Sequence, residues 1–264
     1  MKNSKLYGGL GLFICLLSSA FFIFPLVIMV VRSFHSGGIA NYSRVFDKYN
    51  LFVNFTTSVI VVGCTLAITA VVVSFAAFAF SKLRFRGSRA LYYLLLSGMM
   101  VPVAATIFPL YQIVRGLGLI NSPFSLIFPY ATGSCCFNLL ILKNYYDSIP
   151  NEMLEAANID GANKLRTCWQ VVMPVAKPGL AVVLMQTFLA SWNELQMARI
   201  FIADTDVQPI SVVPVRFAQT ISSRDFTQEV MYAALVICLL PIVIFYIFAA
   251  KSLVNGLTTG AVKG

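Results

Sequence analysis

Apolar residues fall into six long runs that are separated by short polar connections. The runs cover approximately residues 9–31, 55–80, 90–114, 124–142, 179–203 and 230–250. A helix needs about 20 apolar residues to cross a bilayer, and lipid offers no partner to open backbone, so each run predicts a membrane-spanning helix. None of the runs alternates as the strands of a membrane barrel do. The pattern predicts an all-α integral membrane protein with six transmembrane helices.

Composition agrees with a membrane protein. Of the 264 residues, 59% are hydrophobic and 11% are charged, and the mean hydropathy is +0.83. Soluble domains carry roughly 25% charged residues, so a soluble class is excluded. The net charge of +9 does not indicate a nucleic-acid partner, because the basic residues lie in short connections between runs, as orientation signals do.

The distribution of lysine and arginine predicts the topology. The N-terminus, the second-to-third connection, the fourth-to-fifth connection and the tail together carry twelve of them, and the remaining connections carry six. Because cytosolic loops are the more basic, both termini and the fourth-to-fifth connection are predicted to be cytosolic. We expect one transmembrane domain over residues 1–264, with a core at about 55–250.

Proline positions leave two interpretations open. Pro102 and Pro109 lie in the third run and Pro129 in the fourth, where proline removes a backbone donor and can kink a helix. Proline is also simply commoner in membrane helices than in soluble ones. The fifth run has no proline after Pro178, and we expect a straight helix there.

No metal site or nucleotide loop is predicted. Five of the six cysteines lie inside apolar runs, the sixth (Cys168) lies in the fourth-to-fifth connection, and the single histidine is His35. Their spacing matches no metal site, so the cysteines are interpreted as small buried hydrophobes. The Gly-x-x-x-x-Gly-Lys pattern that cradles phosphates is absent from the sequence. We therefore expect neither a catalytic residue nor a bound cofactor in this chain.

The fourth-to-fifth connection, at about 147–178, predicts a short polar helix. Ser148 can cap it, Pro150 suits its first turn, and Glu152 and Glu155 lie where the helix dipole favours acids. Residues that recur at spacings of three and four predict one exposed face of small residues: Met153, Ala156, Ala157 and Asp160. These observations fit an ordinary capped surface helix and a docking helix equally well.

The rest of this connection leads into the fifth run. Gly161 is a natural helix stop. Residues 165–173 form a second amphipathic stretch, which is predicted to lie along the membrane face with Trp169 at interface depth. Pro174 and Pro178 are expected to turn the chain into the fifth span.

Several motifs resemble a known family. The order Glu155-Ala156-Ala157, Gly161, Val171 and Met173-Pro174 resembles the EAA loop of permease subunits of bacterial ABC importers, with Val171 and Met173 where the family often has Ile and Leu. Further stretches are similar to the second permease of carbohydrate importers, the maltose-permease type, at residues 109–111, 116–122, 149–150, 159–162, 191–193 and 256–264. The likeness extends from about residue 55 to the end.

The resemblance implies a complex and a location. A homologous second permease would form a heterodimer with this chain in a bacterial cell (inner, cytoplasmic) membrane, which both subunits cross several times. Two ATP-binding subunits would use ATP and Mg, and their clefts would receive the coupling helix. An extracytoplasmic solute-binding protein would deliver a carbohydrate. The residues implied in docking the ATPase are Glu155, Ala156, Ala157, Asp160, Gly161 and Pro174.

Polar residues that interrupt the fifth run are candidates for the solute pathway: Gln186, Trp192, Asn193 and Glu194. A charge at the bilayer centre costs about 2.5–3.5 kcal/mol, so Glu194 is expected to face the bundle interior or a wet cavity. These residues would contact a sugar, or they would join helices by hydrogen bonds, with Glu194 alternatively paired to Arg199. Weaker candidates are Tyr111, Gln112, Tyr130 and Asn138.

The function predicted is that of a permease subunit in an ATP-driven ABC importer for a sugar or oligosaccharide. Alternatives are an importer of the same type for another solute, such as glycerol phosphate or a polyol, and a membrane scaffold without transport. A secondary transporter or channel is a further alternative, although such proteins commonly show inverted repeats or several intramembrane acids.

Overall fold

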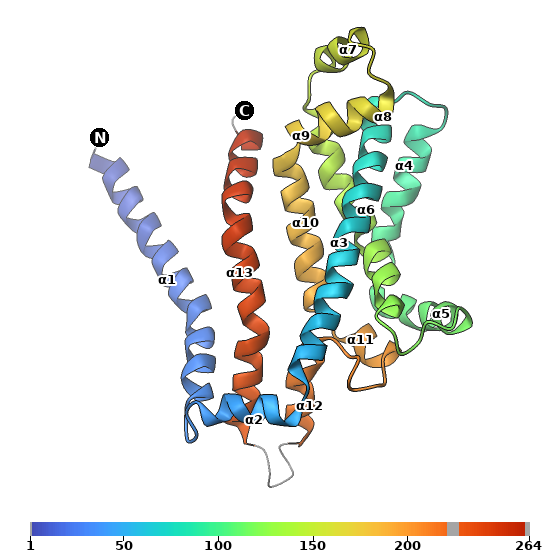
Figure 1. The fold of residues 1–264 in the computed structure, drawn as a ribbon. Coiled ribbons are helices and arrows are strands. Elements are labelled where there is room, and N and C mark those ends of the chain that lie inside the picture. Colours follow the sequence, from blue (N-terminus) through green and yellow to red (C-terminus); the bar gives the residue numbers. More distant parts are fainter. Residues whose placement is uncertain (1, 221–226, 262–264) are drawn as a thin grey trace. The chain divides into compact units, whose positions relative to one another are not determined.

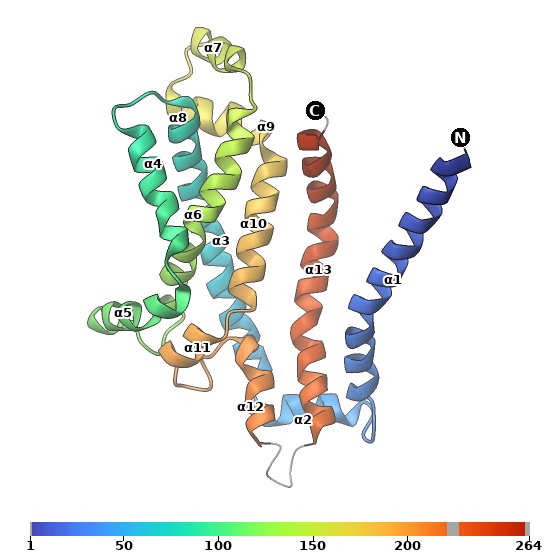
Figure 2. The same cartoon turned by 180° about the vertical axis from the view of Figure 1, so that it is seen from behind.

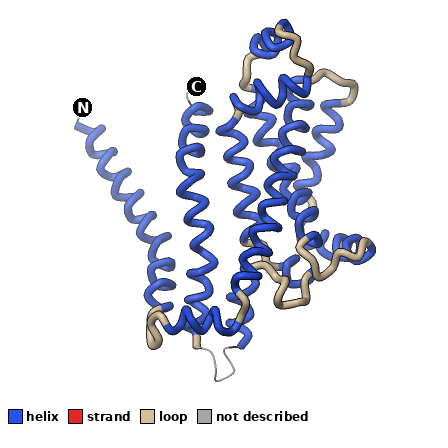
Figure 3. The backbone as a smooth tube through the Cα atoms, viewed as in Figure 1, coloured by secondary structure: helices blue, strands red, loops and turns tan. Residues whose placement is uncertain are grey.

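The computed structural model describes the backbone of residues 2–220 and 227–261, and the side chains of residues 11–219 and 227–248. All regular elements in these ranges are helices, as the sequence predicted (Figure 3). By its contacts the chain divides into two compact units, Met1–Leu51 with Val213–Pro241 and Phe52–Val212 with Ile242–Gly264.

Four described helices are long and apolar enough to cross a membrane: Gly11–Phe34, Leu51–Lys82, Phe124–Asp147 and Gln228–Phe248. Two further candidates are bent pairs of helices. Ser88–Met100 and Val103–Gly116 meet at 100°, and Lys164–Val175 and Lys177–Trp192 meet at 83°. The described residues therefore provide four to six candidate spans.

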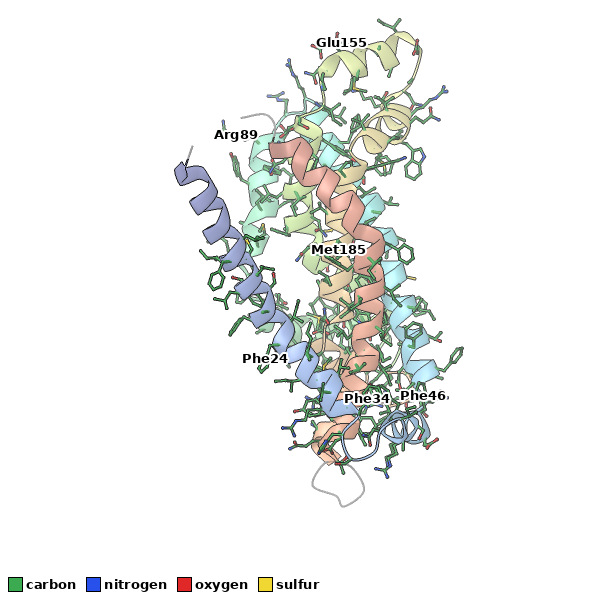
Figure 4. All side chains as sticks on the ribbon, turned by 90° about the vertical axis from the view of Figure 1, so that its left-hand side faces the viewer. Phe24, Phe34, Phe46, Arg89, Glu155 and Met185 are labelled. Atoms are coloured by element: carbon green, nitrogen blue, oxygen red, sulfur yellow. The ribbon has the colours of Figure 1, made fainter. Side chains whose placement is uncertain are left out.

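The first unit contains α1 (Lys2–Ser33), α2 (Ala40–Lys48), α12 (Val213–Thr220) and the first part of α13 (Gln228–Ala261). Asn41 fixes the turn between α1 and α2, because its Nδ2 donates to the carbonyl oxygens of Ser33 at 2.9 Å and His35 at 3.0 Å. Figure 4 shows Phe34 at this turn. His35 thus lies in the loop between α1 and α2.

The second unit places α3 (Leu51–Lys82), α4 (Ser88–Ser97), α6 (Phe124–Asp147) and α10 (Lys177–Trp192) side by side (Figures 1 and 2). One end of this group carries α7 (Asn151–Ile159), α8 (Lys164–Thr167), the π-helical turn η2 (Cys168–Val172) and α9 (Met173–Val175). The other end carries α5 (Val103–Gly116) and α11 (Gln196–Phe201). Short 3₁₀ turns follow α4 at η1 (Gly98–Met100) and precede α12 at η3 (Ile210–Val212).

Two apolar clusters hold this unit together. The cluster nearer α7 joins α3, α6 and α10 to the connection after α6; its buried members are Val73, Ala77, Phe78, Leu139, Leu142, Tyr146, Ile149, Cys168, Val172, Ala176 and Val183. The other joins α3, α5 and α6 to α11, with buried members Val61, Val114, Leu126, Ile127, Tyr130, Met197, Ala198, Phe201, Ile202 and Val212. The polar connection at 147–178 is therefore built into the core of the unit.

Helix α10 approaches α6 closely at its first turn. Gly179 is buried there, and a Cβ atom at this position would overlap the Tyr145 ring of α6. A side chain larger than hydrogen would force the two helices apart, since packed interiors have no spare volume.

The third predicted span, residues 90–114, is not one straight helix. It is broken between Met100 and Val103, and its halves form the 100° pair. Pro102 has no backbone donor and disfavours the helical region for the residue before it, and Val101 is accordingly extended at φ −81° and ψ 118°. The kink interpretation therefore holds at Pro102, whereas Pro109 and Pro129 lie inside α5 and α6.

The fifth predicted span, residues 179–203, is also divided. Helix α10 ends at Trp192, and α11 begins as a separate helix at Gln196. The Glu194 carboxylate accepts hydrogen bonds from the backbone N–H groups of Met197 at 2.8 Å and Ala198 at 3.1 Å, so it starts a new helix instead of continuing the old one. The expected straight helix past Trp192 is wrong.

Candidate functional site

The predicted polar helix is present as α7. It begins after Pro150 and has Glu152 in its first turn. Its end is fixed by Gly161, which adopts φ +77°, and by a hydrogen bond from Ala162 N to Ala157 O at 2.9 Å. This left-handed residue after the last turn is the ending that glycine permits. A helix with a defined start and stop is thus confirmed.

Ser148 does not cap α7, contrary to the prediction. It lies at the C-terminus of α6, where its hydroxyl donates to Tyr145 O at 2.8 Å. Pro150 holds the N-cap position instead, and no side chain caps α7. Helix α6 extends to Asp147, which leaves the serine in the last turn of the preceding helix.

A basic side chain from α3 ties down the start of α7. Lys82 Nζ donates to Ile149 O at 2.6 Å and to Asn151 Oδ1 at 3.3 Å. Ile149 itself is buried in the apolar cluster nearer α7. Hydrogen bonds to charged groups contribute about 1.5–3 kcal/mol when shielded, and Lys82 is partly exposed, so we place this one at the low end. Helix α7 is thus attached to α3 as well as to α6.

The segment after α7 forms its base. Asn163 Oδ1 accepts from Arg166 N at 2.9 Å and caps α8. Cys168 and Val172 are buried in the core, while Trp169 is exposed. The predicted amphipathic stretch is therefore helical, and the predicted turn into the fifth span is the 83° bend that follows α9.

The exposed face of α7 carries acidic and small side chains. Glu155, Ala156 and Asp160 are exposed, together with Ile159, and Figure 4 shows Glu155 on α7. Ala157 is 8% exposed, because it faces the base of the loop. The expectation that both alanines belong to one exposed surface is wrong for Ala157. Gly161, which follows the last turn of α7, is exposed, and so is Pro174 in α9.

Glu194 is the centre of a hydrogen-bond network in the second unit. Besides capping α11, its Oε2 accepts from Tyr130 Oη on α6 at 2.6 Å. Its backbone oxygen accepts from Ser211 Oγ at 2.9 Å. Among the described side chains, no ion pair joins Glu194 to the exposed Arg199. The geometry favours helix-joining hydrogen bonds over pairing with Arg199.

The neighbours of Glu194 differ in exposure. Trp192 is 5% exposed, stacked on Phe188 at a centroid distance of 5.5 Å and edge-on to Phe55 at 6.0 Å. Asn193 is exposed, and its Nδ2 donates to Leu189 O at 2.9 Å. Of these two, Asn193 is the side chain presented to the surroundings.

The remaining pathway candidates lie apart from one another. Tyr111, on α5, packs against Phe201 with centroids 5.8 Å apart. Asn138 is fully buried, and its Nδ2 donates to Thr187 Oγ1 at 2.8 Å, while its Oδ1 has no hydrogen-bond partner among the described residues. Gln112 on α5 and Gln186 on α10 are exposed. The structure thus unites Tyr130 with Glu194 and leaves the other candidates at separate positions.

Sequence reasoning missed three residues that shape these sites: Lys82, Thr187 and Ser211. Thr187 interrupts the fifth run beside Gln186, so the same signal was available for it. Lys82 contributes to topology by its charge, but nothing local in the sequence indicates its contact with a carbonyl 67 positions away.

Comparisons with known proteins agree with this architecture. Residues 70–259 match the family model of the binding-protein-dependent transport system inner membrane component. The probable ABC transporter permease protein YurM of Bacillus subtilis (strain 168) is 33% identical over 213 residues, covering 80% of this chain and 69% of that protein. The trehalose/maltose transport system permease protein MalG of Thermococcus litoralis is 30% identical over 257 residues and 92% of each chain.

A solved structure has a similar fold. It is the crystal structure of a bacterial ABC transporter involved in the import of the acidic polysaccharide alginate. The TM-score is 0.80 at 22% identity, and the alignment covers 95% of this chain and 98% of the other.

Proposed function

This chain belongs to the family of binding-protein-dependent transport system inner membrane components, and from that premise we propose that it carries a sugar or oligosaccharide across a bacterial cytoplasmic membrane. It is an integral membrane permease subunit of an ABC transporter. The sugar class is supported by relatives such as the trehalose/maltose permease. In the proposed topology each bent helix pair is one span, which gives six spans with both termini in the cytosol.

One observation carries the proposal: a short polar helix is exposed, yet it packs on an apolar core and is hydrogen-bonded to α3. Helix α7 presents Glu155 and Ala156 outward, while Ala157 and Ile149 are buried beneath it. A helix supported in this way can bind a partner protein and remain folded. We propose that an ATP-binding subunit docks there, with Glu155 paired to a basic residue of that subunit. ATP and Mg are used in that partner, and its movement changes the access of the solute pathway.

The end of the second unit opposite α7 suits the solute-binding protein (Figure 1). The loop after α11 is held there by Asn121 Oδ1, which accepts from Ala203 N at 2.6 Å, and by Asn54 Nδ2, which donates to Gln208 O at 2.6 Å. A loop fixed by such contacts offers a constant surface to a partner.

Helix α5 has the exposed apolar surface expected of a contact with the second permease. Its apolar side chains Val103, Phe108 and Ile113 are exposed, Phe108 by 69%. Large exposed apolar patches mark interaction sites with proteins or lipid. We propose a heterodimer contact along this helix.

Asn193 and Gln186 are the side chains that we propose for solute contact, because both are exposed on or beside α10. Roles for Trp192, Glu194, Tyr111, Gln112, Tyr130 and Asn138 in the pathway stay predictions. Replacing Asn193 by alanine should raise the KM for solute and leave assembly intact. An unchanged KM would remove Asn193 from the pathway.

The test of the proposed function is uptake by reconstituted complexes. The chain, a second permease and the ATP-binding subunit are placed in proteoliposomes with internal ATP and Mg, and the solute-binding protein is added outside. Labelled maltose, trehalose, a maltooligosaccharide and glycerol 3-phosphate serve as probes. We expect ATP-dependent uptake of a sugar. Uptake of glycerol 3-phosphate alone would indicate another solute, and uptake by this chain alone under an ion gradient would indicate a secondary transporter.

The docking role is tested by Glu155→Lys. We expect uptake and co-purification of the ATP-binding subunit to fall about tenfold or more, since a reversed charge at an interface is repelled, while membrane insertion is unchanged. The matched control is Glu152→Lys, a charge reversal at an exposed position in the first turn of the same helix. Equal uptake by Glu155→Lys and the unaltered protein would refute docking through Glu155.

A further inference from the structure

The loop between α3 and α4 borders a shallow basic depression, called the hollow below. It has a volume of about 510 Å³, opens broadly to the outside and is lined by Phe80, Ser81, Leu83, Arg84, Phe85, Arg86 and Ser88. Arg84 and Arg86 are exposed, and neither forms a salt bridge with an acid among the described residues. Two guanidinium groups thus flank a space that contains no counter-charge.

The start of a helix at this hollow also favours an anion. Helix α4 starts at the hollow, with Gly87 at φ +80° as its N-cap and no capping side chain. The first backbone N–H groups of a helix carry partial positive charge and bind phosphate readily. Arginine, in turn, binds phosphate oxygens in a bidentate manner.

An apolar surface continues from this basic site. Leu91, Leu94 and Leu95 follow on α4 at spacings of three and four, so they share one face of the helix. All three are exposed, Leu94 by 68%. Two residues before Leu91, the Arg89 guanidinium lies 5.9 Å from the centre of the Tyr93 ring. Figure 4 shows Arg89 at the end of this unit that also carries Glu155.

We propose that the α3–α4 loop binds the phosphate of an anionic phospholipid, with its acyl chains along the leucine face of α4. A free phosphate would pair with Arg84 and Arg86 but would leave the leucines uncovered, which is why the lipid is the better occupant. Basic residues beside a membrane attract anionic lipid. Here the hollow and the α4 N-terminus add a defined place for one headgroup. This inference is independent of which solute the protein carries.

The test uses the purified chain in detergent with soluble short-chain lipids. Binding of dioctanoyl phosphatidylglycerol is compared with dioctanoyl phosphatidylcholine, inorganic phosphate and glycerol 3-phosphate. The variant is Arg84→Gln/Arg86→Gln, and the matched control is Arg115→Gln, an exposed arginine at the end of α5. We expect phosphatidylglycerol to bind, the double variant to lose about 30-fold in affinity, and the control to bind normally.

Several results would overturn the proposal. One is that phosphatidylcholine binds as tightly as phosphatidylglycerol. Another is that inorganic phosphate displaces phosphatidylglycerol as well as the lipid itself does. A third is that the double variant and the Arg115→Gln control lose the same affinity. Loss of ATP-binding subunit capture with unchanged lipid binding would assign the arginines to a protein partner. If the double variant does not insert into the membrane, the site is tested on the unaltered chain with a photocrosslinking phosphatidylglycerol probe. Crosslinks within residues 80–95 support the site, and their absence there refutes it.

Discussion

Replacing Glu194 separates its structural role from a role in solute binding. The carboxylate accepts three hydrogen bonds, from Tyr130 Oη, Met197 N and Ala198 N. In Glu194→Ala all three donors lose their partner, and Tyr130 keeps a buried hydroxyl without an acceptor. We therefore expect this variant to lose stability, and we expect the start of α11 to loosen.

The magnitude follows from these contacts. Removing a capping side chain costs about 1 kcal/mol, and a hydrogen bond between a hydroxyl and a charged acceptor adds about 1.5–3 kcal/mol. Glu194 is half-buried, so we place the total at about 2–4 kcal/mol. Glu194→Gln keeps one acceptor oxygen and should cost about 1 kcal/mol. At about 2–4 °C per kcal/mol, alanine should lower the melting temperature by about 5–15 °C and glutamine by about 2–4 °C.

The assay is thermal melting of the assembled complex in detergent, together with a double-mutant cycle between Glu194→Gln and Tyr130→Phe. A coupling energy above about 0.5 kcal/mol is expected for residues in direct contact. The control is Asn193→Ala, next to Glu194, which removes a bond to the backbone carbonyl of the preceding turn but no contact between helices. The reasoning is refuted if Glu194→Ala melts normally and instead raises the KM for solute.

Three further changes test the packing around α7 and α10. Lys82→Met removes the donor to Ile149 O and should lower the local stability of α7 by about 1–2 kcal/mol. The expected result is faster proteolysis of the α7 loop, and an unchanged rate would show that this hydrogen bond does not hold α7. Gly179→Leu should lower the free energy of unfolding by about 1–3 kcal/mol, because the new side chain overlaps Tyr145. The melting temperature should fall, and it should recover when Tyr145→Ala is added if this clash is the cause. Gly161→Ala places a side chain at φ +77° and should destabilise the end of α7 by about 1 kcal/mol. Hydrogen exchange in α7 should become faster, and an unchanged rate would refute the requirement for glycine.

Periodicity and hydropathy predicted the long helices because each must satisfy its own backbone in lipid. The same signals could not predict the two breaks, although Pro102 itself offered a kink as one of two interpretations of the first break. Residues 90–114 are apolar on both sides of Pro102, and average hydropathy is the same for a straight helix and a bent one. In the fifth run, Glu194 was recognised as unusual, but its role as a cap depends on where α10 ends. That end is determined by contacts with α6 and η3.

The segment that contains α7 shows a similar division between what was and was not predictable. The composition of residues 151–161 was sufficient to predict α7 and its glycine ending. Which alanine faces outward was not predictable, because Ala156 and Ala157 are chemically identical and only the base formed by α8 and η2 distinguishes them. The error at Ser148 has the same origin, since α6 extends further than its apolar run.

The hydrogen bond from Lys82 to the start of α7 has a mechanical consequence. A load applied to α7 would pass along the chain into α6 and, through the 83° bend, into α10, and by apolar packing into the core of the unit. The lysine adds a polar link directly to α3. A displacement of α7 would thus be transmitted to α3, α6 and α10 together. We therefore expect these three helices to move as one body instead of separating near α7.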